Sequence, residues 1–131
     1  MTKAPDVVGE IMTVNVVGVA PDDPVSSAVR AMVDHDIGSV LVTEDDRAVG
    51  VFTERDLTRR ILDDPDLLAR PIREVMSAPV HAVRPDTEIQ QAFDLMNAKG
   101  VRRLAVLDGT RLVGIVTERD LLRWVSAVAA E

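Results

Sequence analysis

The pattern of hydrophobic and polar residues changes period several times along the chain, and these changes predict alternating helices and strands. Apolar residues spaced three and four apart predict a helix over residues 24–35, with Asp23 as its N-cap. Two stretches rich in β-branched residues follow, Ser39–Thr43 and Ala48–Thr53, and the polar segment Glu44–Arg47 between them predicts a hairpin. The apolar stripe of the predicted helix comprises Val25, Ala28, Val29, Met32 and Val33.

Shorter segments complete the first half of the chain. Val14–Val19 is rich in β-branched residues and predicts a first strand, and residues 7–12 fit a short amphipathic turn before it. A second helix is predicted from Glu54 to about Asp63. The proline-containing segment Asp64–Ala69 is the best linker in the chain, so we expect the first domain to span residues 7–66.

The residue pattern of the second half predicts the same elements, in the same order, as that of the first half. We expect the second domain to span residues 71–130. Each half therefore reads β-α-β-β-α, which indicates a mixed α/β (α+β) fold. The predicted elements are a short helix at Ile72–Met76, a strand at Val80–Val83, a helix at Thr87–Lys99 that stops at Gly100, a hairpin of Arg103–Leu107 and Arg111–Val116 around Asp108–Gly109, and a last helix from Glu118 to about Ala129.

The two halves are related by a fixed offset. Gly50–Asp56 reads Gly-Val-Phe-Thr-Glu-Arg-Asp, and it returns 64 positions later as Gly114–Asp120, which reads Gly-Ile-Val-Thr-Glu-Arg-Asp. At the same offset Met12 aligns with Met76, and the alignment needs no gap. Self-similarity at a fixed offset is typical of supersecondary units that bury their faces on each other, so the chain is predicted to be a tandem repeat forming a pseudo-twofold pair.

The Thr-x-x-Asp sequence in each recurring stretch allows two interpretations. One is structural: Thr and Asp form a capping box that satisfies backbone amides at the start of a helix. The other is a binding site, because an ionised Asp accepts hydrogen bonds from both hydroxyls of a ribose, while a Thr hydroxyl beside the amides of a helix start suits a phosphate. The residues concerned are Thr53, Asp56, Thr117 and Asp120.

The repeated pattern resembles the CBS domain, a module named for cystathionine β-synthase that normally occurs in pairs (Bateman modules). The resemblance covers nearly the whole chain. It rests on Gly-h-x-Thr-x-x-Asp in both repeats, on the strand at Val101–Asp108, and on Met12-Thr13 and Met76-Ser77 at the start of each repeat. It implies a stand-alone CBS pair with two β-α-β-β-α repeats packed sheet to sheet about a pseudo-twofold axis.

In CBS proteins the Ser/Thr and the Asp of this motif contact the ribose and phosphate of a nucleotide, so the resemblance implies those roles for Thr53, Asp56, Thr117 and Asp120. The ligand is expected in the cleft between the repeats, with its adenine in an apolar slot near the first strand of the same repeat. Arginines near the motif are candidate phosphate ligands, and solvation at the surface explains each of them equally well. The remaining candidate binding residues are Val14, Val16, Ile37, Gly38, Arg55, Ala78, Val80, Val101, Arg102, Arg103 and Arg119.

Composition narrows the classes of function. The 131 residues include 15 Lys and Arg against 22 Asp and Glu, and this net charge of −7 argues against a nucleic-acid partner. Cysteine is absent, which excludes disulfides and thiolate metal sites. No apolar run approaches the length needed to cross a bilayer, and no signal-like segment opens the sequence, so we expect a soluble, cytoplasmic protein without a membrane partner.

The sequence offers no set of residues suited to catalysis, so an enzyme is not predicted. His35 and His81 lie far apart in different repeats and are not expected to bind a metal. Glu54 and Asp56, two positions apart on a helix, point in diverging directions and therefore do not form an acid–base pair.

Two functions fit these observations. The first is a stand-alone regulatory module that binds AMP, ADP or ATP, with S-adenosylmethionine as a further candidate, and signals through its conformation or its affinity for a separate regulated protein. The alternative is a ligand-free structural or dimerisation scaffold. The second repeat has Arg102-Arg103 where the first has Gly38-Ser39, so the two phosphate environments are expected to differ. A homodimer is predicted from the apolar stripes of Leu57, Ile61, Leu121, Trp124, Val125 and Val128.

Overall fold

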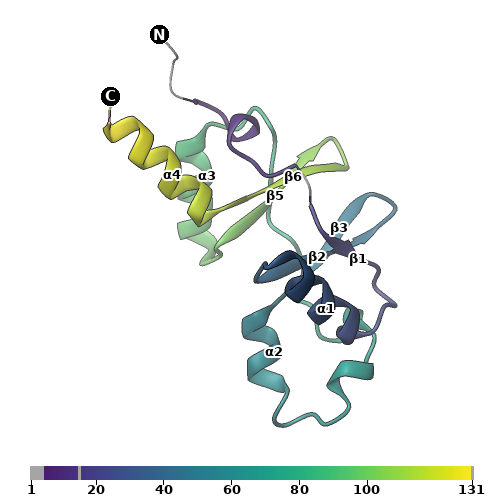
Figure 1. Cartoon of the computed structure of the whole chain (residues 1–131). Helices are drawn as coiled ribbons and strands as arrows, with labels where there is room; N and C mark the ends of the chain where they lie inside the picture. The colour runs from purple at the N-terminus through teal and green to yellow at the C-terminus, as the bar shows by residue number, and fades with distance from the viewer. Residues whose placement is uncertain (1–4, 15, 131) are drawn as a thin grey trace. The chain divides into compact units, whose positions relative to one another are not determined.

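The computed structural model describes residues 5–14 and 16–130 (Figure 1). The described part of the chain has two three-stranded sheets and four α-helices, which confirms the predicted mixed α/β class. Contacts divide the chain into two compact units, which we treat separately. Unit 1 takes its residues from 1–15 and 81–131, and unit 2 comprises residues 16–80.

Unit 2 is a sheet in the order β1-β2-β3, covered by helices. β1 (Gly18–Val19) pairs in parallel with β2 (Ser39–Glu44), which pairs antiparallel with β3 (Arg47–Thr53). The hydrophobic core lies between this sheet, α1 (Val25–His35) and α2 (Glu54–Arg60). Its completely buried members include Val25, Ala28, Val42, Phe52, Leu67 and Ile72.

Unit 1 repeats the plan with β4 (Ala82–Val83), β5 (Arg103–Asp108) and β6 (Arg111–Thr117), again with one parallel and one antiparallel pairing. α3 (Ile89–Lys99) and α4 (Glu118–Ala129) lie side by side against the sheet (Figure 1). The core is aliphatic, as the low aromatic content requires, and its completely buried residues are Val8, Ala92, Val106, Val116 and Leu121.

Several predicted boundaries were wrong. Of the strand predicted at Val14–Val19, in which Asn15 lies outside the described residues, β1 comprises Gly18–Val19, and the strand predicted from Val80 begins at Ala82. Val17 and His81 each accept one backbone hydrogen bond from the central strand without being register partners. The second helix ends at Arg60 instead of Asp63. Asp23 does not cap α1: its Oδ2 accepts from Ala20 N at 2.9 Å, so the carboxylate stabilises the preceding turn.

The ends of α1 and α3 show how the repeats solve one problem with different residues. Gly100 ends α3 in the left-handed conformation with φ 64°, as predicted from sequence. Asp36 occupies the equivalent position after α1 with φ 52°. Asp is one of the few side chains that enter this region at modest cost, because its short polar group bonds locally.

The first residues of each repeat pack into the other repeat. The 3-10 turn η1 (Val8–Glu10) belongs to unit 1, where Val8 N donates to Thr87 O at 2.9 Å and Val8 is completely buried. The equivalent turn η3 (Ile72–Glu74) belongs to unit 2, where Ile72 N donates to Asp23 O at 2.8 Å. We call residues 5–14 and 69–80 the lead segments. Each unit is therefore the body of one repeat closed by the lead segment of the other.

Each lead segment also adds a short bridge to the sheet that it joins. Ser77 exchanges two backbone hydrogen bonds with Val51 of β3, at 2.9 and 3.0 Å. Thr13 makes the same pair with Ile115 of β6, at 2.8 and 3.0 Å. The partners of these bridges, Val51 and Ile115, lie two residues before Thr53 and Thr117. The packing of each lead segment on the other repeat, which we call the exchange, therefore brings it close to a Thr-x-x-Asp motif.

The glycine of each motif makes room for a methionine of the exchanged segment. A Cβ added at Gly50 would lie 2.3 Å from Sδ of Met76. One added at Gly114 would lie 2.6 Å from Sδ of Met12 and 2.9 Å from the backbone oxygen of Thr13. Both distances are shorter than van der Waals contact, so a larger residue must displace the Met76 side chain at Gly50, and the Met12 side chain and the Thr13 backbone at Gly114.

Trp124 further fixes the first lead segment in unit 1. Its indole Nε1 donates to the backbone oxygen of Pro5 at 2.7 Å, and its ring lies 6.1 Å from that of Phe93 on α3. The side chain is half-buried. Trp124 therefore packs within its own unit, although its place in an apolar stripe suggested a dimer contact.

We expect Gly50→Ala to lower the free energy of unfolding by about 1–3 kcal/mol, the usual cost of overpacking a filled site. In a Met76→Ala background the same substitution should cost less, because the Met76 side chain beyond Cβ is gone. Urea unfolding of the four proteins in this double-mutant cycle measures the coupling. Equal costs in both backgrounds would contradict the assigned contact.

Candidate functional site

The corner where β3 meets α2 forms a complete capping box. Thr53 Oγ1 accepts from Asp56 N at 3.1 Å, while Asp56 Oδ2 accepts from Thr53 N at 2.9 Å and from the Thr53 hydroxyl at 3.0 Å. The structural interpretation of the Thr-x-x-Asp motif is therefore realised in the first repeat. Oδ1, the second oxygen of Asp56, takes no part in this box.

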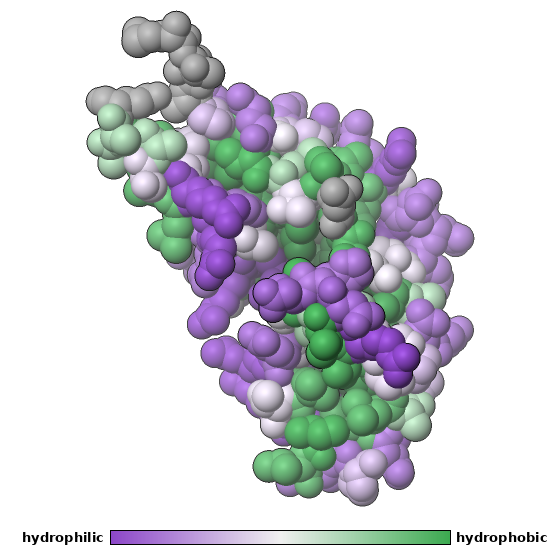
Figure 2. All heavy atoms as spheres, in the orientation of Figure 1, coloured by the Kyte–Doolittle hydropathy of each residue, from purple (hydrophilic) through white to green (hydrophobic). Residues whose placement is uncertain are grey.

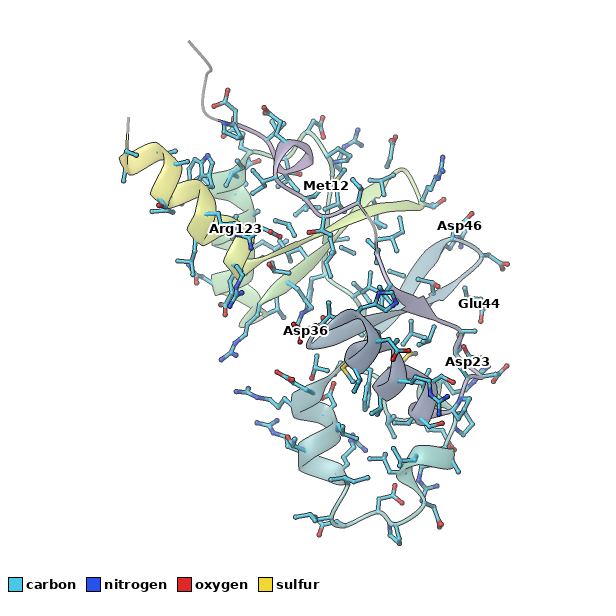
Figure 3. All side chains as sticks on the ribbon, in the orientation of Figure 1. Met12, Asp23, Asp36, Glu44, Asp46 and Arg123 are labelled. Carbon is cyan, nitrogen blue, oxygen red and sulfur yellow. The ribbon has the colours of Figure 1, made fainter. Side chains whose placement is uncertain are left out.

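The corner between β6 and α4 repeats the arrangement. Asp120 Oδ2 accepts from Thr117 N at 2.9 Å and from its hydroxyl at 3.1 Å, and Thr117 Oγ1 accepts from Asp120 N at 3.4 Å. Asp120 is 8% exposed, whereas Asp56 is only half-buried. Oδ1 of Asp120 faces Nη1 of Arg123 at 3.9 Å, and Arg123 projects from the first turns of α4 (Figure 3).

The start of the central strand lies directly beside each motif. In unit 2, Glu54 N donates to Gly38 O at 3.0 Å, and Ser39 is the register partner of Thr53. The Glu54 carboxylate lies over Gly38, because a Cβ added there would be 3.2 Å from Oε1. The predicted residues Gly38, Thr53 and Asp56 are therefore brought together.

In unit 1 the start of the central strand β5 likewise lies beside the motif, and the residues there are arginines. Glu118 N donates to Arg102 O at 3.0 Å, and Arg103 is the register partner of Thr117. Arg102 Nε lies 3.9 Å from Oε1 of Glu118, with both side chains more than half exposed. The backbone of Arg102 and Arg103 thus lies beside Thr117 and the start of α4.

Other predicted residues have more ordinary surroundings. Ile37 and Val101 are half-buried and pack against the cores of their own units. Arg55 and Arg119 are exposed on the first turns of α2 and α4.

The exchange changes which apolar segment accompanies which motif. We expected each adenine slot near the first strand of the same repeat. In the structure, Ala78 and Val80 follow the Ser77 bridge to β3 and belong to unit 2 with Thr53. Val14 follows the Thr13 bridge to β6 and belongs to unit 1, whereas Val16 belongs to unit 2. Ala78 and Val14 are exposed, and Val16 and Val80 are half-buried.

Two neighbours of the motifs were not identified from sequence as site residues. Arg123 is one, although its position, three residues after the Asp, is a helical neighbour of Asp120 and gave a usable signal. Ser77 is the other, and it had no such signal, since its proximity to β3 depends on the exchange. No cluster of three metal-ligating side chains occurs in the described residues. No helix there is long and apolar enough to cross a bilayer.

The family is shown by comparison with known proteins. The CBS domain profile matches residues 8–63 and 72–127, so the chain belongs to the CBS domain family as a tandem pair. An uncharacterized protein of Methanopyrus kandleri is 38% identical over 121 residues, which cover 88% of this chain. The match covers 61% of that archaeal protein's length.

Solved structures show the same fold. A CBS-domain containing protein from Agrobacterium tumefaciens superposes with a TM-score of 0.85 at 25% identity, covering 95% of this chain and 97% of the other. The CBS domain pair of protein MJ0100, solved in complex with 5′-methylthioadenosine and S-adenosyl-L-methionine, superposes with a TM-score of 0.83 at 21% identity. That match covers 94% of this chain and 98% of the other.

Removing a cap should destabilise each unit by a known amount. We expect Thr53→Val to lower the free energy of unfolding by about 1 kcal/mol, because Asp56 N loses its acceptor. Thr53→Ser keeps the hydroxyl and should retain most of the stability. Chemical denaturation of both variants measures the difference, and equal losses would contradict the assigned role of the hydroxyl as the cap.

Proposed function

We propose that the protein is a regulatory CBS pair that binds an adenine nucleotide at one or both motif corners. The observation that carries this proposal is that the two oxygens of each motif carboxylate have different roles. One oxygen, Oδ2, serves the capping box, while Oδ1 stays outside it in both Asp56 and Asp120. The cap thus holds an ionised acceptor in a fixed orientation, and the hydroxyls of a ribose are suitable donors for it.

The surroundings of the corner suit the rest of such a ligand. The positive end of the α4 dipole and the adjacent arginines favour a phosphate group. Val14 in unit 1, and Ala78 and Val80 in unit 2, supply apolar surface near the motifs for a base. Each unit therefore has its own candidate binding site, consisting of the motif Thr and Asp with the neighbouring residues of that unit, which we call its half-site.

The ligands of a structural neighbour support the same class. The MJ0100 pair was solved with two molecules that both contain adenosine, and these share the ribose and adenine of AMP, ADP and ATP. AMP, ADP and ATP are the ligands that we propose, with S-adenosylmethionine as a further candidate. No catalytic role is proposed.

A ligand-free scaffold is the competing function. The observation that favours it is the completeness of both capping boxes, since they account for Thr53, Asp56, Thr117 and Asp120 without any ligand.

We also propose that a homodimer or a separate regulated protein covers the outer faces of α2 and α4. Leu121 is completely buried and Leu57 half-buried, so these two serve the cores. The residues that stay exposed include Ile61 at 37%, Leu122 at 65%, Val125 at 45% and Val128 at 40%. Hydrophobic surface is visible over the end of unit 2 that follows α2, at the bottom of Figure 2. Exposed apolar side chains of this kind, taken separately on each unit, are typical of interaction surfaces.

A nucleotide that binds the folded protein should raise its melting temperature. At about 100 times its Kd a ligand adds roughly 2.7 kcal/mol, or a shift on the order of 10 °C for a chain of this size. We expect this shift with at least one of AMP, ADP, ATP and S-adenosylmethionine, and its loss in Asp56→Ala or Asp120→Ala. If no ligand moves the transition and both variants only melt lower, the scaffold function is correct.

The homodimer is tested by Val125→Glu in unit 1 and Ile61→Glu in unit 2. Each substitution places a charge at an exposed apolar position outside the buried core. We expect light scattering to show a dimer for the unmodified protein and a monomer for the variants, because burying an unpaired charge is costly. Val33→Glu, at a side chain 74% exposed on α1, is the matched control and should remain dimeric. A monomeric unmodified protein would contradict the homodimer.

A further inference from the structure

The two motif corners carry the same acidic residues but differ in how those acids are neutralised. In unit 1 each acid faces an arginine: Glu118 lies 3.9 Å from Arg102, and Asp120 lies 3.9 Å from Arg123. The corner of unit 1 is therefore electrically balanced before any ligand arrives, and the backbone of Arg103 pairs with that of Thr117.

In unit 2 the equivalent acids have no cationic partner within 4.0 Å among the described residues. Glu54 lies over Gly38, the position that corresponds to Arg102, so no side chain faces its carboxylate there. Ser39 stands where unit 1 has Arg103. Asp56 likewise makes no ion pair within the described part of the chain, although Arg59 corresponds in sequence to Arg123.

The remaining arginines do not remove this difference. Arg55 and Arg119 occupy equivalent, exposed positions in the two units and so contribute equally. Arg60 is extra in unit 2, but it lies at the far end of α2 from the motif, where its charge acts on Asp64. The pKa of Asp64 is lowered chiefly by its hydrogen bond with Arg70.

We infer that the two half-sites sort adenosine ligands by charge. The half-site of unit 1 takes a phosphorylated adenosine such as ADP, and that of unit 2 takes an adenosine with a neutral or cationic substituent, such as the sulfonium of S-adenosylmethionine. This inference rests on the proposed nucleotide-binding function. Both ligands share the ribose that Asp56 or Asp120 would accept, so the selectivity comes from the groups around the 5′ substituent.

The chemistry of the substituent explains the direction of the preference. A diphosphate carries two or more negative charges and needs nearby arginine, which binds phosphate through charge-assisted hydrogen bonds. Next to the carboxylates of Glu54 and Asp56, which have no arginine or lysine within 4.0 Å in the described part of the chain, the same diphosphate would be repelled. A sulfonium or ammonium group meets the opposite situation, since those two carboxylates attract it.

Equilibrium dialysis of the full chain with labelled ADP and labelled S-adenosylmethionine tests the inference. We expect Arg102→Ala to weaken ADP binding at least tenfold and to leave S-adenosylmethionine binding unchanged. Arg111→Ala removes an exposed arginine at the opposite end of β6 and is the matched control, with no effect on either ligand. Glu54→Gln should weaken S-adenosylmethionine binding and leave ADP binding intact.

A transplanted charge provides the converse test. Gly38→Arg gives unit 2 the arginine of unit 1, and the three atoms nearest to its Cβ all belong to the flexible Glu54 side chain. We expect this variant to bind a second ADP and to lose S-adenosylmethionine. Asp120→Asn, which keeps an oxygen for the cap, should lose the first ADP site only.

The outcomes distinguish a failure of charge sorting from a failure of nucleotide binding. If ADP and S-adenosylmethionine compete for one half-site, or if ADP binding survives Arg102→Ala and fails in Glu54→Gln, sorting by charge is wrong while nucleotide binding stands. If neither ligand nor unmodified adenosine binds the full chain, the proposed function is wrong and the sorting with it.

Discussion

The structure depends on the contact between a lead-segment methionine and the glycine of the opposite repeat's motif. Met76 against Gly50 and Met12 against Gly114 bring a segment of each repeat onto the sheet of the other. The bridges at Ser77 and Thr13 lie one residue after these methionines and hold the same segments to the sheets. Those bridges determine which segments lie near the motif threonines. Core closure and site assembly thus rest on the same interaction.

Much of the fold was predictable because the relevant signals are local. Helix periodicity, hairpin turns and the stop at Gly100 depend on neighbours within a few residues, and the structure confirms them. The lengths of β1 and β4 were not predictable, since pairing with a central strand ends them and β-branched composition does not. The exchange was hidden for a further reason. A fixed offset of 64 positions is the same whether a lead segment packs on its own repeat or on the other.

The candidate site shows a similar boundary between local and distant information. The capping boxes follow from Thr-x-x-Asp alone, and both form as the sequence indicates. The difference between the corners does not follow from the helices themselves, because Arg59 and Arg123 occupy equivalent positions while only Arg123 approaches its Asp within ion-pair distance. Burial distinguishes them: Asp120 is 8% exposed and Asp56 is half-buried, which depends on packing across the whole unit.

The exchanged lead segments also bear on how such a chain can arise from a single repeat. The body of one repeat has a sheet and two helices, but the core position of Val8 or Ile72 is filled by the lead segment of the other repeat, since its own lead segment packs in the other unit. A protein with only one repeat would complete this unit by trading lead segments between two copies. Joining the copies in one chain makes the trade intramolecular and raises its effective concentration, so that folding no longer depends on protein concentration. Within one chain, therefore, the two repeats complete each other without depending on a second molecule.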